Sequence, residues 1–289
     1  LHGCYRDSAA DKYYCWGASW DGQTTTKQNH TPPVQGNSNV SKPKAFAAGH
    51  DHTCALDKDG TIWCWGSNYY GQLGKTAGGA TQAVPSDIEI LGSGNKALAA
   101  CSHASCAIRG DETVVCWGDD SELQIGTKSS GTSFSYPAGT DTRVLAVTLG
   151  GRHGCALKKD GKVICWGDHN DGRLGMPSPS STGYGEVINL TNIKAISAGW
   201  RFTCALDSDG KVFCWGGNGH HELGPQATRS TYVPTQVPLP TGTKATKIAA
   251  GWNHVCALLD DDRLACWGST GLGQLGSGAP AREVHRILP

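Results

Sequence analysis

Cysteines are the residues of this chain with the clearest potential for chemistry. Of 13 cysteines in 289 residues, 12 fall into pairs spaced ten or eleven residues apart. The pairs are Cys4 and Cys15, Cys54 and Cys64, Cys106 and Cys116, Cys155 and Cys165, Cys204 and Cys214, and Cys256 and Cys266. Such thiols could form disulfides, bind zinc or stay reduced in the core. Because zinc sites usually need closer cysteine spacing and a second pair nearby, we predict six disulfides.

A turn signal between the two cysteines of most pairs would set them opposite each other. In the second pair, Asp-Gly at 59–60 is flanked by β-forming residues, which predicts a hairpin with glycine in the left-handed position of a three-residue loop. Cys54 then faces Cys64 at a non-hydrogen-bonded position, where side chains come close enough for a disulfide. The same turn position holds Gly161, Gly210, Glu112 and Asp262, the last two being weaker signals. The first pair needs a longer, even-numbered loop.

Six disulfides imply an oxidising compartment, so we expect a secreted or cell-surface protein. Lys+Arg 25 balance Asp+Glu 25, and this neutral charge argues against a nucleic-acid-binding protein. No apolar run approaches the roughly 18 residues that span a bilayer. We therefore expect neither nucleic acid as a partner nor a membrane span.

The cysteine pairs belong to a repeat of about 50 residues, a period typical of propellers and solenoids. The second cysteine of every pair is followed by Trp-Gly, at Trp16, Trp65, Trp117, Trp166, Trp215 and Trp267. About four short strands per unit, hairpins apolar on both faces and the lack of a helix-period segment are typical of stacked propeller blades. We therefore predict an all-β fold: a β-propeller of six such repeats, each blade an antiparallel sheet with a hairpin disulfide.

The two ends of the chain suggest how the ring closes. The segment 282–288 resembles the strand that opens later units, whereas residue 1 falls midway through a unit. We expect one β-propeller domain over 1–289, with the ring closed by pairing of the N- and C-terminal segments.

The unit is clearest at 47–74, which reads Ala-Ala-Gly, His-Thr-Cys-Ala-Leu, Asp-Gly, Trp-Gly and Gly-Gln-Leu-Gly in order. This pattern resembles the repeat of the regulator of chromosome condensation family, in six copies over essentially the whole chain. The resemblance implies a β-propeller, although many family members have seven blades. The paired cysteines resemble the secreted bacterial branch, which includes a propeller-type β-lactamase inhibitory protein. The fold hosts exchange factors, inhibitors and scaffolds, so the family alone leaves the function open.

One face of the propeller is expected to bind a partner. Successive turns of an antiparallel blade alternate between its ends, so the loops after Ala-Gly and after Trp-Gly open on the same face. These loops are rich in Trp, Tyr and Arg, which dominate binding hot spots. The predicted contact residues are Trp20, His50, Asp51, Tyr69, Tyr70, His103, Arg152, Trp200, Arg201, His220, Trp252 and Asn253. The resemblance agrees, because the inhibitory propeller binds its enzyme through the corresponding loops.

Three histidine-containing patterns offer potential metal ligands. Histidines recur at one repeat position, as His2, His52, His153 and His254, and we interpret them as structural hydrogen-bonding groups. The segment 220–222 lacks the i, i+4 spacing of a helical zinc motif, and 168–172 departs from the calcium-loop pattern. We therefore predict no metal site and no cofactor.

Cys101 is the unpaired thiol. It occupies the position that Gly49, Gly150, Gly199 and Gly251 hold in other repeats. We expect it to be buried or capped, and the alternative is a bridge to another chain.

The sequence favours an extracellular, non-enzymatic binding module whose aromatic loop face engages a protein partner. A carbohydrate-binding lectin is the first alternative, since Trp and Tyr beside Asp, Asn and His also suit sugars. The residues after Ala-Gly differ between repeats, however, which favours one asymmetric footprint. A structural component of a surface or filament assembly is the second alternative. We expect no enzyme, because the chain has no G-x-S-x-G elbow and no phosphate-binding glycine loop.

Overall fold

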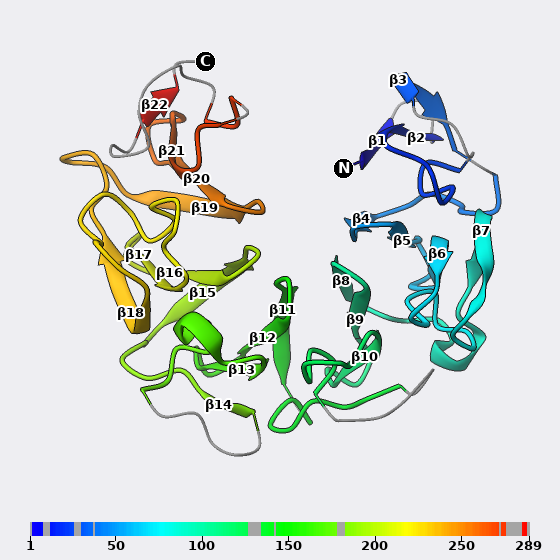
Figure 1. The fold of residues 1–289 in the computed structure, drawn as a ribbon, viewed down its shortest axis with the longest axis horizontal. Coiled ribbons are helices and arrows are strands. Elements are labelled where there is room, and N and C mark those ends of the chain that lie inside the picture. Colours follow the sequence, from blue (N-terminus) through cyan, green and yellow to red (C-terminus); the bar gives the residue numbers. More distant parts are fainter. Residues whose placement is uncertain are drawn as a thin grey trace. The chain divides into compact units, whose positions relative to one another are not determined.

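The computed structural model describes residues 2–7, 12–25, 30–36, 38–126, 134–141, 143–177, 183–271, 273–275 and 285–287. The chain divides into two compact units, Leu1–Val147 and Thr148–Pro289. Its described strands form six antiparallel sheets, one for each repeat, which match the blades of a six-bladed β-propeller (Figure 1). The predicted all-β class is therefore confirmed.

The first three sheets are built from strands of the first unit. These strands are β1 (His2–Asp7), β2 (Lys12–Gly17), β3 (His30–Gln35), β4 (Ala45–Ala48), β5 (His52–Leu56), β6 (Ile62–Asn68), β7 (Gly79–Asp87), β8 (Ala97–Cys101), β9 (Ala104–Ile108) and β10 (Val114–Gly118). A short 3-10 helix, η1 (Glu89–Leu91), follows β7.

The remaining three sheets belong to the second unit, whose first strand begins just before the boundary. Their strands are β11 (Val144–Leu149), β12 (His153–Lys158), β13 (Val163–Gly167), β14 (Tyr184–Glu186), β15 (Ile193–Ala198), β16 (Phe202–Asp207), β17 (Val212–Gly216), β18 (Thr231–Val237), β19 (Ala245–Ala250), β20 (His254–Leu259), β21 (Leu264–Gly268) and β22 (His285–Ile287). The 3-10 helix η2 (Asn170–Gly172) follows β13.

Each sheet is a meander, because its strands pair in chain order. Four sheets have four strands, and the sheet of β8–β10 has a single bridge between Cys116 and Ser135 beside its third strand. β22 pairs with β21 as the fourth strand of the last sheet, with Ile287 opposite Leu264. A single domain closed by pairing of the two terminal segments stays a prediction.

The six predicted disulfides are present, each across a hairpin with its cysteines directly opposite. Their Cα atoms lie 4.0–4.2 Å apart, as expected for the closely approaching, non-hydrogen-bonded positions of an antiparallel pair. Gly60 takes the predicted left-handed conformation, with φ 80°. Glu112 and Asp262 adopt it too, with φ 69° and 62°, so the same turn forms without glycine. The predicted first loop falls at residues 8–11, outside the described residues.

Apolar side chains on both faces of the hairpins form the core between neighbouring sheets. Every residue of β5 and of β9 is buried. In the first unit, Leu56 and Ile62 of the second sheet share a core cluster with Ala107 and Trp117 of the third. In the second unit the side chains of Phe202 and Trp267 belong to one such cluster. Burial on both faces is what stacking of blades requires.

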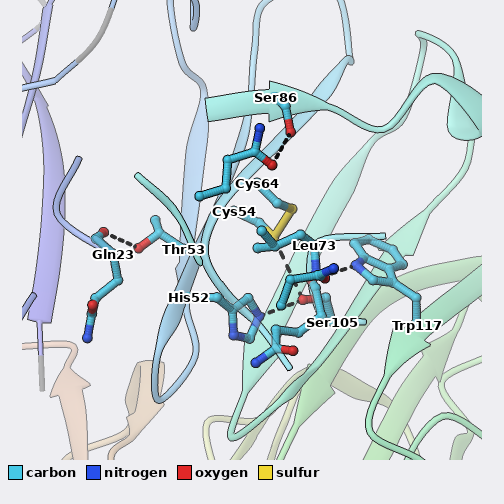
Figure 2. The surroundings of a disulfide bond; sticks show 12 residues. Gln23, His52, Thr53, Cys54, Cys64, Leu73, Ser86, Ser105 and Trp117 are labelled. Carbon is cyan, nitrogen blue, oxygen red and sulfur yellow. Dashed lines mark hydrogen bonds between the residues drawn. A yellow bond between two sulfur atoms is a disulfide. The ribbon is translucent and has the colours of Figure 1, made fainter. Parts of the chain in front are cut away.

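Histidines at the repeated position join neighbouring sheets through hydroxyl groups. The bonds connect His2 with Thr53, His52 with Ser105 and His153 with Thr203 over 2.6–2.8 Å. Figure 2 shows His52 reaching Ser105 beside the disulfide of Cys54 and Cys64. Burial lowers the pKa of His52 and of His153 to about 3, so both rings are neutral at physiological pH. The predicted structural role is therefore confirmed for His2, His52 and His153.

Packing against the same histidines explains why Cys101 can occupy a position that is glycine in other repeats. A Cβ atom added at Gly49 would lie 2.2 Å from the ring of His52, so that position requires glycine. In the third repeat Cys101 replaces the glycine and Ala104, its partner across β8 and β9, replaces the histidine. The small alanine leaves room for the cysteine side chain. Cys101 forms no disulfide, is half-buried, and burial raises the pKa of its thiol to about 11.

Candidate functional site

The loops that carry the predicted contact residues of the second unit are anchored to the next repeat. The indole Nε1 of Trp267 donates a hydrogen bond of 2.8 Å to the backbone carbonyl of Glu222. The carboxylate of Glu222 accepts a 2.8 Å bond from the backbone N–H of His220. Burial raises the pKa of Glu222, although the His220 bond opposes the shift. The loop between β17 and β18 is therefore held in one conformation before any partner binds.

The same construction fixes a loop of the first unit. Trp117 donates from its indole to the carbonyl of Gln72 over 2.9 Å, and the side-chain oxygen of Gln72 accepts the backbone N–H of Tyr70 over 2.8 Å. Preformed loops avoid part of the entropic cost of ordering on binding. The two aromatic residues at 69–70 are thus presented on a rigid turn.

Backbone hydrogen bonds tie the loops after Ala-Gly to one another. In the second unit the N–H of Trp200 donates to the carbonyl of Trp252 over 2.8 Å, and Gly151 donates to the carbonyl of Trp200 over 3.0 Å. In the first unit His50 donates to Ser102 over 2.8 Å. Loops from successive repeats are therefore linked directly.

Loops of the second unit line a pocket of about 470 Å³, here called the tryptophan pocket. It is lined by Asp171, Trp200, Arg201, Gly217, Asn218, Gly219, His220, Glu222, Ser230, Trp252 and Asn253. Five of the predicted contact residues thus come together from the β15–β16, β17–β18 and β19–β20 loops. Asn218 and Ser230 were not predicted, although Asn218 follows Trp215 by three residues just as Asn68 follows Trp65.

A stacked pair of indoles forms the apolar part of the tryptophan pocket. The ring centroids of Trp200 and Trp252 lie 4.4 Å apart at an interplanar angle of 24°. Trp200 is half-buried and packs against Gly151, where a Cβ atom would lie 2.5 Å from its ring. Trp252 is 43% exposed. A flat aromatic surface is therefore held rigidly beside polar groups.

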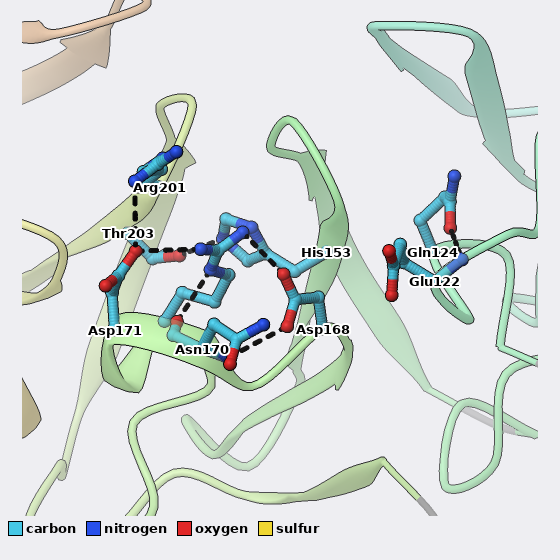
Figure 3. Close-up of polar contacts among 9 residues, drawn as sticks. Glu122, Gln124, His153, Asp168, Asn170, Asp171, Arg201 and Thr203 are labelled. Atoms are coloured by element: carbon cyan, nitrogen blue, oxygen red, sulfur yellow. Dashed lines mark hydrogen bonds and ion pairs between the residues drawn. The ribbon is translucent and has the colours of Figure 1, made fainter.

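Charged groups of both signs lie beside the indoles. The buried guanidinium of Arg173 pairs with Asp168 over 3.0 Å and with Asp171 over 2.9 Å. Figure 3 labels these two carboxylates and Arg201. Asp171 also lies 3.6 Å from the guanidinium of Arg201, which is exposed. Arg173 therefore holds Asp171 in place, and Asp171 in turn orients Arg201 at the pocket.

A second group of predicted residues meets in the first unit, here called the histidine cluster: His50, Asp51, Tyr70 and His103. The Asp51 carboxylate lies 2.7 Å from Nδ1 of His50 and 3.4 Å from Nε2 of His103. Tyr70 stacks on the His103 ring with centroids 4.6 Å apart, and Tyr69 packs edge-on against Tyr70. Partial burial acts to raise the pKa of Asp51, but the hydrogen bond and charge of His50, with His103, lower it below its usual value.

Three predicted contact residues belong to neither group: Tyr69, which packs edge-on against Tyr70, Trp20 and Arg152. Trp20 follows β2 in the first unit and is 71% exposed, and Arg152 lies exposed in the β11–β12 loop of the second. No helix in the described parts of the chain has the length and apolar character to cross a membrane.

Family models for the regulator of chromosome condensation (RCC1) repeat match segments of both units. One matches residues 59–108, 160–206 and 209–258, together more than half the chain. A second RCC1 repeat model matches 44–72, 144–173, 193–222 and 245–274.

Curated relatives share part of this repeat array. A regulator of chromosome condensation from Xenopus laevis is 32% identical over 113 residues, which cover 37% of this chain and 26% of that protein. A probable E3 ubiquitin-protein ligase, human HERC6, is 31% identical over 119 residues, covering 39% of this chain and 12% of that protein. The chain thus spans about a quarter or less of these relatives.

Solved structures with low sequence identity share the fold. Human WBSCR16 has a TM-score of 0.80 at 20% identity, covering 96% of this chain and 80% of that one. Yeast RCC1 (Prp20), in its complex with Kap60, has a TM-score of 0.60 at 21% identity, covering 96% and 83%. The ectodomain of the Arabidopsis thaliana receptor kinase ACR4 has a TM-score of 0.58 at 20% identity, covering 94% and 79%. The repeat matches and the six sheets together lead to one conclusion: this chain belongs to the RCC1 repeat family of β-propellers.

Proposed function

We propose that this chain is an extracellular, non-enzymatic binding module that engages a protein partner through the tryptophan pocket. Six hairpin disulfides are consistent with an oxidising compartment and hence with secretion or display at the cell surface. The observation that carries the proposal is the stacked pair of Trp200 and Trp252 beside the exposed Arg201. Trp and Arg are the residue types enriched at the energetic centre of protein interfaces.

Rigidity strengthens the argument for binding. The pocket's loops are joined by backbone bonds, and the Trp252 indole is stacked before a partner arrives. A partner therefore gains contact area without the cost of ordering these side chains. A partner residue with an apolar or aromatic body could lie on Trp252, while Arg201 and Asn253 offer hydrogen bonds around it.

Other predicted contact residues extend the proposal within each unit. We include the exposed Trp20 and Tyr69 of the first unit and Arg152 of the second as further contacts. Their side chains differ from repeat to repeat, which favours one asymmetric protein footprint over six equivalent sugar sites. A lectin and a structural component of an assembly are the two competing functions that the experiment must separate.

The experiment is affinity capture from native extracellular material with the immobilised chain, the Trp252→Ala variant and the Tyr136→Ala variant. Tyr136 is an exposed aromatic residue of the first unit outside both groups, so it is the matched control. Elution uses a sugar mixture first and denaturant second. A defined protein that resists sugar should be retained by the wild type and the control, and bound at least ~30-fold more weakly by Trp252→Ala.

Each other result counts against the proposal. Release by sugar would indicate a lectin. Capture of further copies of this chain would favour a structural assembly. Equal binding by wild type and Trp252→Ala would place the partner site outside the tryptophan pocket.

A further inference from the structure

The histidine cluster brings three metal-binding side chains together at one point of the first unit. Asp51 lies between the two imidazoles, 2.7 Å from Nδ1 of His50 and 3.4 Å from Nε2 of His103. One potential ligand atom from each residue lies within 4.8 Å of the other two. His50 and Asp51 come from the β4–β5 loop, and His103 comes from the β8–β9 loop of the next repeat.

The separations suit a small divalent cation. Zinc binds histidine nitrogen and carboxylate oxygen at about 2.0–2.2 Å in tetrahedral geometry, which places neighbouring ligand atoms about 3.3–3.5 Å apart. The contact between Asp51 Oδ2 and His103 Nε2 already has this length, and the contact between the other carboxylate oxygen, Oδ1, and His50 Nδ1 is shorter. A small opening of the cluster would therefore make room for the ion, since all three side chains lie at the surface with 45%, 22% and 26% exposure for His50, Asp51 and His103.

Two neighbouring side chains contact the imidazole of His103. Its ring stacks on Tyr70, and its Nδ1 lies 3.4 Å from the hydroxyl of Ser102. Metal-binding histidines usually engage their second ring nitrogen in such a hydrogen bond, which leaves the first for the metal. Ser102 itself has a left-handed backbone, with φ 47°, and accepts the N–H of His50, so the same residue connects both loops.

Although the sequence alone predicts no metal site, this geometry leads us to propose that His50, Asp51 and His103 bind one divalent transition-metal ion, with zinc as the best match. Two imidazoles and a carboxylate suit borderline cations such as zinc better than calcium or magnesium, which prefer oxygen ligands. Three protein ligands leave a fourth position for water or for a donor atom of another molecule. The proposal concerns the first unit and does not depend on the tryptophan pocket.

The test is calorimetric titration of the complete, disulfide-intact chain with zinc ions in a non-chelating buffer. We expect one equivalent to bind, and binding at least about tenfold weaker in Asp51→Asn and in His103→Gln. His169→Gln is the matched control, because His169 is an exposed histidine outside the cluster. This control should bind zinc like the wild type. Near-ultraviolet circular dichroism verifies that each variant is folded.

Cobalt supplies a second readout that uses only the wild-type chain. Cobalt in place of zinc should give visible absorption typical of four or five nitrogen and oxygen ligands, without the near-ultraviolet band of a cobalt–thiolate bond. A thiolate band would assign the metal to Cys101 and overturn the proposal. The absence of zinc uptake by the wild type, or unchanged uptake by both Asp51→Asn and His103→Gln, would overturn it as well.

Discussion

Acid should destabilise the folded chain through two buried histidines, His52 and His153. Both are fully buried and hydrogen-bonded to a hydroxyl of the next repeat. Burial is the main reason that the pKa of each is lowered to about 3, and nearby positive charge adds to the effect. In the unfolded chain a histidine titrates near pH ~6.5. The unfolded state therefore takes up the proton first, so stability present above pH ~6.5 is lost as the pH falls towards ~3.

The expected magnitude follows from this difference in proton uptake. Between pH ~6.5 and pH ~3, each histidine lowers the free energy of unfolding by about 1.4 kcal/mol for every unit by which the pH falls. At pH ~4.5 the loss is about 3 kcal/mol for each, a large share of the roughly 5–15 kcal/mol that stabilises a typical domain. Urea denaturation followed by tryptophan fluorescence, repeated at several pH values between about 7 and 4.5, measures the slope.

Substitution by glutamine isolates each contribution. His52→Gln removes the titrating ring while its amide can still hydrogen-bond to Ser105, so the pH slope should decrease by about 1.4 kcal/mol per pH unit. His153→Gln should do the same. His169→Gln, at an exposed position, is the control and should keep the wild-type slope. A wild-type slope in both buried-site variants would refute the reasoning.

Two further predictions concern the position shared by glycine and Cys101. Gly49→Ala places a Cβ atom against the ring of His52 and should cost about 1–3 kcal/mol in urea denaturation. His52→Ala in the same chain should recover part of that cost, and no recovery would contradict the packing explanation. Cys101, whose thiol has a pKa of about 11, should react with iodoacetamide at pH ~8 about 100-fold more slowly in the native protein than in urea. Mass spectrometry with disulfides intact measures both rates, and equal rates would show that burial does not protect the sulfur.

The hairpins and disulfides were predictable because the register of a hairpin is a local property. Once the turn at 58–60 is placed, the position of Cys54 opposite Cys64 follows by counting along two strands. The turn was harder to predict where the last loop residue is not glycine. Glu112 and Asp262 still adopt the left-handed conformation, because the flanking strands and the disulfide impose it.

The candidate sites were only partly predictable. Sequence position identified which loops carry Trp200, Trp252 and His220, but their convergence on one pocket depends on how successive sheets pack. The arginine at 173 gave no signal, since its role in holding Asp171 appears only with its buried ion pairs.

The repeat, the six disulfides, the all-β class and the residue types available to a binding surface could be predicted from the chain alone, since these follow from spacing and alternation along one strand or hairpin. Which side chains of different repeats meet could not be predicted in this way. Asp51 and His103 are separated by a whole repeat, and no spacing rule connects them. The sequence shows that the third repeat has Cys101 and Ala104 where other repeats have glycine and histidine. The reason that the two positions change together is the close contact between them, which the structure shows at Gly49 and His52. Contacts between repeats depend on the packing of one sheet against the next, and that packing is a three-dimensional property.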